Sequence, residues 1–393
     1  MQDLFLRRGG ERRLRGGHLW VYSNEIDTSR LKLSDFAPGD SVCVRAAGGQ
    51  LLGSAYLDPN ALICGRLYAP LEDRPFDGDL LRERIGEALA LRERLFDSPH
   101  YRLVYGDSDQ LPGMVVDRFD DVLVLQLNNP GLERYTDDIA AALVDTVQPA
   151  GLLCRADSRA RREQNAASAP EVLHGAVPDR VPFIENGVRF EAPVYTGQKT
   201  GWFYDHRVSR ARLRAYVEGA RVLDVYSYIG GWGVQAAVFG ASQVTCVDSS
   251  AAALDGVEIN AARNGVESRI DTLRGSAADA MTQFASESRQ FDVVILDPPA
   301  FVQRRKDLKK GITAYRRINE LALKLLAPGG VLVSASCSMH LSRADLMTAV
   351  QQGATRAGCQ VRVIEQGGQG PDHPVHPAIP ETEYLKTLFA VKS

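Results

Sequence analysis

The chain has 393 residues, of which 45% are hydrophobic and 24% charged, and its formal net charge is −3. This length allows two or three domains with substantial cores, and the composition excludes a disordered or fibrous protein. No apolar run approaches the roughly 20 residues that span a bilayer, and the first residues lack the pattern of a secretory signal, so we expect a cytoplasmic protein without a membrane segment.

The cysteines and the basic residues narrow the classes of site. The six cysteines form no C-x-x-C pair, which argues against zinc and against a disulfide framework, and five of them are expected to be buried small hydrophobic residues. The arginines and lysines are clustered despite the negative net charge, and local clusters set a phosphate-binding surface. For each cluster, a solvated basic face is the alternative. The clusters are Arg7, Arg8, Arg12, Arg13 and Arg15; Arg155, Arg159, Arg161 and Arg162; and Arg304, Arg305, Lys306, Lys309 and Lys310.

The first half of the chain predicts two small domains. Residues 1–70 contain short alternating runs between glycine turns, which is typical of a β-rich module. Residues 71–182 predict a central α+β domain with a loose connection over 163–182, which is rich in Ala, Ser and Pro. Its expected elements are a helical segment within 71–98, strands at 101–105, 113–118 and 122–127, and a helix at 132–147.

Helix and strand signals alternate in residues 183–393, which predicts a doubly wound α/β domain. Antiparallel strands are expected from Val361 onward. The expected helices cover 208–218, 232–239, 251–264, 277–286 and 313–326, and the expected strands cover 221–225, 243–247, 269–273, 293–296 and 331–335.

An acid and a thiol follow two of these strands. Asp297 comes directly after Val293–Leu296, and Cys337 follows Val331–Ala335, with the 313–326 helix between them. Strand, helix and strand form a βαβ unit, and the carboxyl ends of parallel strands meet at one edge of a sheet. We therefore expect Asp297 and Cys337 at the same edge.

A cofactor site is predicted after the first strand of this domain. The strand 222–225 runs into a loop that carries Tyr226 and Tyr228 and ends at Gly230. Tyrosines in place of glycines depart from G-x-G-x-x-G and weaken a dinucleotide prediction, because a pyrophosphate needs close backbone contact. S-adenosylmethionine carries no phosphate, and Asp224 suits its cationic groups. Asp248 ends the next strand, where an acid can accept hydrogen bonds from ribose hydroxyls; capping of the following helix is the alternative.

Taken together, these segments resemble the bacterial 23S rRNA large-subunit methyltransferases that make 5-methylcytidine, over nearly the whole chain. The chain departs from that family at His206, where glutamine is usual, at Ser276, where an acid is frequent, and at Met339-His340. The matching segments are Tyr105–Gly113, Gly197–Arg207, Asp224–Trp232, Leu296–Val302, Ala314–Asn319, Ser336–Ser338 and Asp372–Pro374.

The resemblance implies three domains: an N-terminal PUA domain for RNA, a central α/β domain and a Rossmann-like class I methyltransferase domain that uses S-adenosylmethionine. It also implies 23S rRNA or a large-subunit assembly particle as partner, with a homodimer left open. The residues that it assigns to the cofactor are Lys199, Asp224, Tyr226, Ser227, Gly230, Asp248, Ser276 and Asp297.

The chemistry assigns two catalytic residues. Carbon 5 of cytosine becomes nucleophilic when a thiolate adds to carbon 6, so Cys337 is predicted as the nucleophile and Asp297 as the acid that holds the pyrimidine edge. The proton acceptor stays open between Asp297 and a water molecule. Methylation of a base nitrogen by direct transfer and a non-catalytic RNA-binding assembly factor are the alternatives.

RNA binding is predicted at Arg12, Arg13, Arg304, Arg305 and Lys306 and should weaken with salt. Trp20 and Tyr22 are expected to pack in the β-rich domain rather than to stack on bases.

Overall fold

The structure is a computed structural model that describes residues 1–156 and 168–393, which form two compact units. Unit 1 comprises Met1–Val181, Ala192–Tyr204 and Pro371–Thr382, and unit 2 comprises Pro182–Glu191, Asp205–Gly370 and Glu383–Ser393. Arg159, Arg161 and Arg162 of the second basic cluster lie outside the described residues. No helix in the described ranges is long and apolar enough to cross a membrane.

Unit 1 begins with a five-stranded sheet in the order β1-β3-β4-β5-β2, which confirms the predicted β-rich module. Because side chains alternate between the two faces of a strand, those on one face of this sheet are buried in a separate hydrophobic core that includes Leu4, Val21 and Val44. Gly53 lies in β4 with a φ of 143°, and a Cβ there would stand 2.6 Å from the carbonyl oxygen of Ala69. The strands are β1 Gln2–Phe5, β2 Trp20–Tyr22, β3 Ser41–Arg45, β4 Leu51–Leu57 and β5 Ile63–Pro70.

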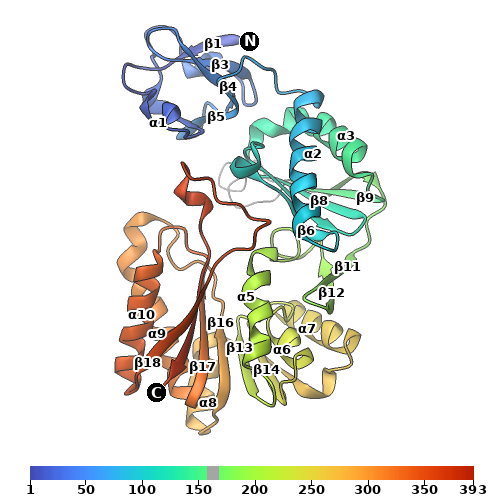
Figure 1. Cartoon of the computed structure of the whole chain (residues 1–393), viewed down its shortest axis with the longest axis vertical. Coiled ribbons are helices and arrows are strands. Elements are labelled where there is room, and N and C mark those ends of the chain that lie inside the picture. The colour runs from blue at the N-terminus through green and yellow to red at the C-terminus, as the bar shows by residue number, and fades with distance from the viewer. Residues whose placement is uncertain (157–167) are drawn as a thin grey trace. The chain divides into compact units, whose positions relative to one another are not determined.

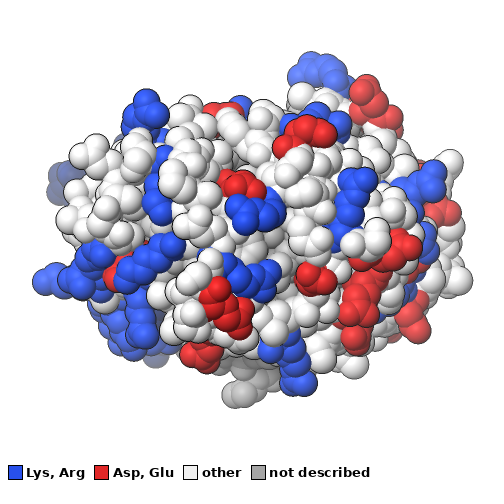
Figure 2. Space-filling view, turned by 90° about the horizontal axis from the view of Figure 1, so that it is seen from below, with Lys and Arg blue, Asp and Glu red and all other residues white. Residues whose placement is uncertain are grey.

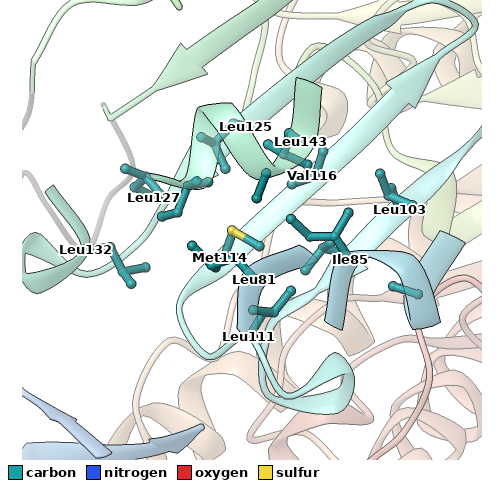
Figure 3. Close-up of a cluster of buried hydrophobic side chains, with 14 of the residues drawn as sticks. Leu81, Ile85, Leu103, Leu111, Met114, Val116, Leu125, Leu127, Leu132 and Leu143 are labelled. Carbon is teal, nitrogen blue, oxygen red and sulfur yellow. The ribbon is translucent and has the colours of Figure 1, made fainter. Parts of the chain in front are cut away.

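The central part of unit 1 is a second five-stranded sheet, in the order β10-β9-β8-β7-β6, which packs against helices α2 (Gly78–Leu95) and α3 (Thr136–Val147). Asp77 caps α2 by accepting a hydrogen bond from the Leu80 amide. The apolar faces of both helices meet the sheet in one buried cluster (Figure 3). The strands are β6 His100–Tyr105, β7 Met114–Phe119, β8 Val122–Leu127, β9 Gly151–Arg155 and β10 Glu171–Gly175.

The predicted loose connection over 163–182 is wrong at its end, where β11 (Arg180–Glu185) begins, and at residues 171–175. These residues form β10, which pairs antiparallel with β9 at the edge of the sheet. Glu171, Val172 and His174 are exposed. An edge strand that buries so little shows no hydrophobic periodicity, so only its pairing partner identifies it.

Arg92 on α2 makes a buried ion pair in unit 1. Its guanidinium, which is fully buried, binds both oxygens of Asp109 at 2.7 Å and donates to the carbonyl oxygens of Arg102 and Asp372 at 3.0 Å. It therefore ties α2, the turn after β6 and the segment Pro371–Thr382 together.

Replacing Arg92 by alanine is expected to lower the free energy of unfolding by about 3–5 kcal/mol, because Asp109 would remain as an uncompensated buried charge. Urea unfolding measures the effect. Arg82→Ala is the matched control on the same helix: its ion pairs with Asp79 and Asp145 are solvent-exposed, and the loss should stay below about 1 kcal/mol. Equal effects of the two substitutions would contradict this account.

Unit 2 contains a seven-stranded sheet in the order β15-β14-β13-β16-β17-β19-β18, which confirms the doubly wound α/β prediction. Pairing is parallel from β15 to β17, and β19 is antiparallel to both β17 and β18, as expected for the tail. The strands are β13 Arg221–Val225, β14 Gln243–Asp248, β15 Ile270–Arg274, β16 Phe291–Leu296, β17 Leu326–Ser336, β18 Val361–Gly367 and β19 Lys386–Lys392.

Helices cover both faces of this sheet, with α5, α6 and α7 on one face and α8, α9 and α10 on the other (Figure 1). The second set buries a large apolar cluster against β13, β16 and β17. A two-stranded sheet, β11 (Arg180–Glu185) with β12 (Val188–Pro193), precedes the domain. The helices are α5 Arg207–Arg212, α6 Gly233–Val238, α7 Ala251–Arg263, α8 Ala277–Ser286, α9 Leu308–Leu325 and α10 Arg343–Ala357.

Three helices differ from the predictions by several residues. Helix α3 begins at Thr136 rather than at 132, because Pro130–Tyr135 form a 3-10 helix. Helix α9 begins at Leu308, five residues before the expected start, because Gly311 lets its first turn approach Val302: a Cβ on Gly311 would stand 2.2 Å from a Val302 methyl carbon. Helix α5 ends at Arg212 and continues only as a 3-10 turn, Leu213–Ala215, so the expected helix over 208–218 is too long.

Candidate active site

The carboxyl ends of β13, β14, β16 and β17 lie along one edge of the unit 2 sheet. The register pairs Val225 with both Val247 and Leu296, and Leu296 with Ser334. The residues that follow these strands therefore share this edge, as predicted for Asp297 and Cys337.

The loop after β13 doubles back over the end of β14. Tyr226 and Tyr228 have φ values of 67° and 49°, which non-glycine residues rarely adopt, and Gly230 has 85°. The amide of Tyr226 donates to the Val247 carbonyl at 2.9 Å, and the amide of Tyr228 donates to Asp248 Oδ2 at 3.0 Å. Such strain persists only where the surroundings enforce it, and it gathers at functional sites.

Asp224 is fully buried beneath this loop. Its Oδ2 accepts a hydrogen bond from the Gly233 amide at 2.8 Å, whereas Oδ1 has no partner in the described part of the chain, and neither has the buried Ser227 hydroxyl. Burial raises the pKa of Asp224 to about 7, although the Gly233 amide opposes the shift. Asp224 Oδ1 and the Ser227 hydroxyl could therefore accept hydrogen bonds from a ligand that carries positive charge.

Asp248 shapes the loop and does not cap α7. Its Oδ2 holds the Tyr228 amide and its Oδ1 accepts from the Ser250 amide at 2.9 Å, whereas the helix cap is Ser250, whose Oγ accepts from the Ala253 amide at 3.3 Å. The capping alternative for Asp248 is therefore wrong.

Two predicted cofactor residues have other contacts. Ser276 caps α8: its hydroxyl donates to Asp279 Oδ2 at 2.8 Å and accepts from the Asp279 amide at 3.2 Å. Lys199 belongs to unit 1, has a φ of 51°, and places its ammonium 4.7 Å from the centroid of the Phe203 ring. A cofactor role for either residue stays a prediction.

Both oxygens of Asp297 are held by side chains of unit 2. Oδ1 lies 3.1 Å from His206 Nε2, and Oδ2 accepts a hydrogen bond from the Trp232 indole at 3.0 Å. Burial raises the pKa of Asp297, but His206, Trp232 and Arg210 together outweigh burial and lower it below its ordinary value. The carboxyl group is therefore an ionised hydrogen-bond acceptor at neutral pH.

Sequence reasoning missed the partners of Asp297. His206 was noted only as a departure from the family and Trp232 only as the end of a matching segment. Behind them, Arg210 lies 5.9 Å from the Trp232 ring centroid and pairs with the buried Glu185 at 2.6 Å, and Gln235 also donates to Glu185. This network orients the indole that holds Asp297.

Cys337 lies half-buried between two buried serines whose hydroxyls meet on one tyrosine. Ser336 Oγ donates to the Tyr315 hydroxyl at 2.8 Å, and Ser338 Oγ lies 3.0 Å from that hydroxyl. Ser338 Oγ also accepts from the Val302 amide at 3.2 Å. The cysteine segment is thus bound to Tyr315 on α9 and, through Ser338, directly to the turn that follows Asp297.

The other cysteines differ from Cys337. Cys43, Cys64, Cys154 and Cys246 are buried, and burial raises the pKa of each, so they remain thiols, as predicted. Cys359 is half-buried rather than buried, and its Sγ lies 3.7 Å from the Ala354 carbonyl oxygen at the end of α10.

The basic residues predicted to bind RNA differ in solvent exposure and in ion pairing. Arg304, Arg305 and Lys306 are all exposed in the connection before α9, and Arg12 is exposed on α1 (Arg12–Arg15). Arg13 instead pairs with Glu25 at 2.7 Å, with its guanidinium 4.3 Å from the Tyr22 ring centroid.

Elsewhere the surface charge is mixed. Figure 2 shows basic and acidic side chains interspersed over the viewed face, with lysines and arginines gathered at one edge. Trp20 is partly buried against the β-rich core and donates to Asp107 at 2.9 Å, in keeping with packing.

No group of three or more His, Cys, Asp or Glu residues in the described ranges could hold a metal ion. The doubly wound sheet, the strained tyrosine loop after its first strand and the buried acid with an open oxygen fit the class of S-adenosylmethionine-dependent methyltransferases. The corresponding family model matches residues 125–387, and a PUA-like domain model matches residues 4–70.

The chain belongs to the family of ribosomal RNA large subunit methyltransferase I. It is 35% identical to that protein from Shewanella denitrificans over 98% of both chains, and 35% identical to that from Erwinia tasmaniensis over 98% of this chain and 97% of the relative. Two solved structures share the fold over 100% of both chains: a putative methyltransferase from Streptococcus mutans with a TM-score of 0.84 and 19% identity, and a putative methyltransferase complexed with SAH, with 0.86 and 20%.

Proposed function

We propose that the protein transfers a methyl group from S-adenosylmethionine to carbon 5 of a cytidine in 23S rRNA, either free or within a large-subunit assembly particle in the cytoplasm. The observation that carries the proposal is the position of Cys337: a half-buried thiol after β17, next to Ser338, whose hydroxyl accepts a hydrogen bond from Val302 in the turn after Asp297. The names of the relatives support large-subunit rRNA as the substrate.

The cofactor site of the proposal is the β13 loop. Bound S-adenosylmethionine supplies an electrophilic methyl group. The open Oδ1 of Asp224 and the Ser227 hydroxyl would accept hydrogen bonds from its amino-acid end, and Asp248 would hold its ribose. Tyr226 and Gly230 would line the site with backbone, and Lys199, Ser276 and Asp297 complete the predicted set.

The reaction begins with the Cys337 thiolate. Its sulfur adds to carbon 6 of the cytosine, and the electron pair of the 5,6 double bond makes carbon 5 the nucleophile that takes the methyl group. The proton on carbon 5 then passes to a base, either Asp297 or a water molecule, its bonding electrons restore the double bond, and the bond between carbon 6 and the Cys337 sulfur breaks to return the thiolate. The ionised Asp297, held by His206 and Trp232, would accept hydrogen bonds from the exocyclic amine of the base.

Exposed arginine and lysine side chains would bind the phosphates of the RNA. Arg304, Arg305 and Lys306 have exposed side chains and follow Asp297 by seven to nine residues in the chain. Arg12 is exposed in the PUA-like domain. Arg13 would bind phosphate only by giving up or sharing its ion pair with Glu25. A flipped-out cytidine can enter such a site from a loop or from single-stranded RNA.

Trapping with an RNA fragment that contains 5-fluorocytidine tests the proposal. Fluorine cannot leave as the proton does, so the wild-type protein should accumulate a methylated protein–RNA adduct that survives denaturing electrophoresis. Asp297→Asn should form this adduct at least about 100-fold more slowly, because the carboxylate that holds the base is lost.

Three outcomes would contradict the proposal. Turnover to a methylated nitrogen without any adduct would indicate direct transfer, and RNA binding without methyl transfer would indicate an assembly factor. Methylation of carbon 5 through an adduct to a residue other than Cys337, located by peptide mapping, would remove its nucleophile.

A further inference from the structure

Lys386 is a buried lysine beside the cysteine segment. It lies on β19 opposite Ser336 in the antiparallel pair with β17, and it is 5% exposed. Its ammonium donates to the carbonyl oxygen of Ser338 at 2.6 Å and to that of Tyr384 at 2.8 Å. Both acceptors are neutral, and no carboxylate in the described ranges forms an ion pair with this ammonium.

A buried ammonium with only carbonyl acceptors requires an anion nearby to remain charged at low cost. Burial lowers the pKa of Lys386 to about 8, and Cys337 is the largest influence that opposes this shift. The remaining charged groups around Lys386 are weaker: Arg343 on α10 lowers its pKa, whereas Glu383 and Asp345 raise it.

The same thiol also influences the Tyr315 hydroxyl, which is bound to Ser336 and Ser338 on either side of Cys337 in the chain. Burial raises the pKa of Tyr315, and Cys337 contributes to that rise. The cysteine therefore lies within electrostatic reach of a buried ammonium on β19 and of a buried hydroxyl on α9.

We propose that Lys386 keeps the Cys337 thiol ionised and fixes its position, with the ammonium as the counter-charge of the thiolate and the hydrogen bond to the Ser338 carbonyl as the anchor of the segment. The thiol proton passes to water, and Lys386 stays protonated. The importance of Lys386 for catalysis rests on the proposed function, but its effect on the ionisation of Cys337 does not.

Lys392 provides a matched control. It lies on the same strand, and its ammonium likewise donates to two backbone carbonyls, those of Leu323 at 2.8 Å and Leu326 at 2.5 Å. It differs from Lys386 in that its acceptors lie at the end of α9 and the start of β17 rather than in the cysteine segment. Substitution of the two lysines by methionine therefore separates loss of a buried carbonyl-bound ammonium from loss of the charge beside Cys337.

Iodoacetamide alkylation of the full-length protein tests the proposal, with the Cys337 peptide quantified by mass spectrometry from pH 5.5 to 9.5. Lys386→Met should slow alkylation at pH 7 about tenfold and move the midpoint of the profile upward by about one pH unit. Lys386→Arg should keep most of the wild-type rate, and Lys392→Met should not change the profile. Identical profiles for Lys386→Met and Lys392→Met would overturn the proposal.

A reciprocal measurement needs no substitution of the lysine. If the two groups stabilise each other's charge, Cys337→Ala must lower the pKa of Lys386, as followed by the NMR shift of its ε-carbon. An unchanged lysine titration would also overturn the proposal. Failure of the proposed function is distinct: Cys337 would then be dispensable for methylation while its alkylation still depended on Lys386.

Discussion

Cys337→Ala is expected to lower methyl transfer to RNA by at least about 1,000-fold while S-adenosylmethionine still binds. Removal of a covalent nucleophile eliminates the whole pathway through the carbon 6 adduct, and only a far slower uncatalysed attack by carbon 5 remains. The substitution deletes one sulfur atom from a half-buried position, so the hydroxyl network of Ser336, Tyr315 and Ser338 can persist.

Incorporation of a labelled methyl group into rRNA measures the effect, with mass mapping of the product to identify 5-methylcytidine. Cys359→Ala is the control, because Cys359 is the other half-buried cysteine and lies just after the C-terminal end of α10. It should retain wild-type activity. Full carbon 5 methylation by Cys337→Ala would refute the assignment of the nucleophile.

Asp224→Asn is expected to weaken S-adenosylmethionine binding about 10- to 100-fold, the value of a hydrogen bond between charged partners in a buried site. The wild-type affinity should also depend on pH. Because the pKa of ligand-free Asp224 is about 7, a cationic ligand must expel its proton below that pH, and Kd should rise about tenfold per pH unit there. The Asn variant should lose this dependence.

The free energy of unfolding of the ligand-free protein also depends on the ionisation of Asp224. The pKa of Asp224 is raised from 3.8 to about 7, so the stabilisation by its proton is fully present below pH 3.8 and is lost as the pH rises through 7. Ionisation costs about 4 kcal/mol. Asp224→Asn should therefore be more stable than the wild type at pH 8.

Calorimetry between pH 6 and 8 and urea unfolding measure both effects of Asp224. Asp255→Asn is the control, since Asp255 is exposed on α7 and its substitution removes the same carboxylate charge. A wild-type affinity that is constant over this range would show that Asp224 does not meet the cationic group of the ligand.

Strands β13, β14 and β16 of unit 2 could be predicted from the sequence to within two residues at each end, whereas β17 begins at Leu326, five residues before its predicted start. Buried parallel strands are continuous apolar runs bounded by turn residues, so β13, β14 and β16 are visible without a partner. The edge strand β10 was missed because its exposed side chains carry no such signal. The start of α9 was misplaced because its first turn packs through a glycine rather than through an apolar face.

The site was predicted unevenly for the same reason. Asp224, Asp297 and Cys337 end or follow strands, and a linear pattern of strand ends locates them at one edge. His206 and Trp232 hold Asp297 from 91 and 65 residues away along the chain, and Lys386 reaches Ser338 from 48 residues away. No local pattern marks such partners, because pairing across that distance depends on which elements the fold brings together.

The sequence alone therefore determined the class of fold, and it predicted the loop proposed to hold the cofactor and the thiol and acid of the proposed chemistry, because each follows from local composition at a strand end. Only the tertiary structure decided their electrostatic state. Burial leaves one oxygen of Asp224 open, His206 and Trp232 keep Asp297 ionised, and an antiparallel strand from the end of the chain brings the charge of Lys386 beside Cys337. Charge, desolvation and hydrogen bonding depend on three-dimensional neighbours, and these are absent from any stretch of sequence read by itself.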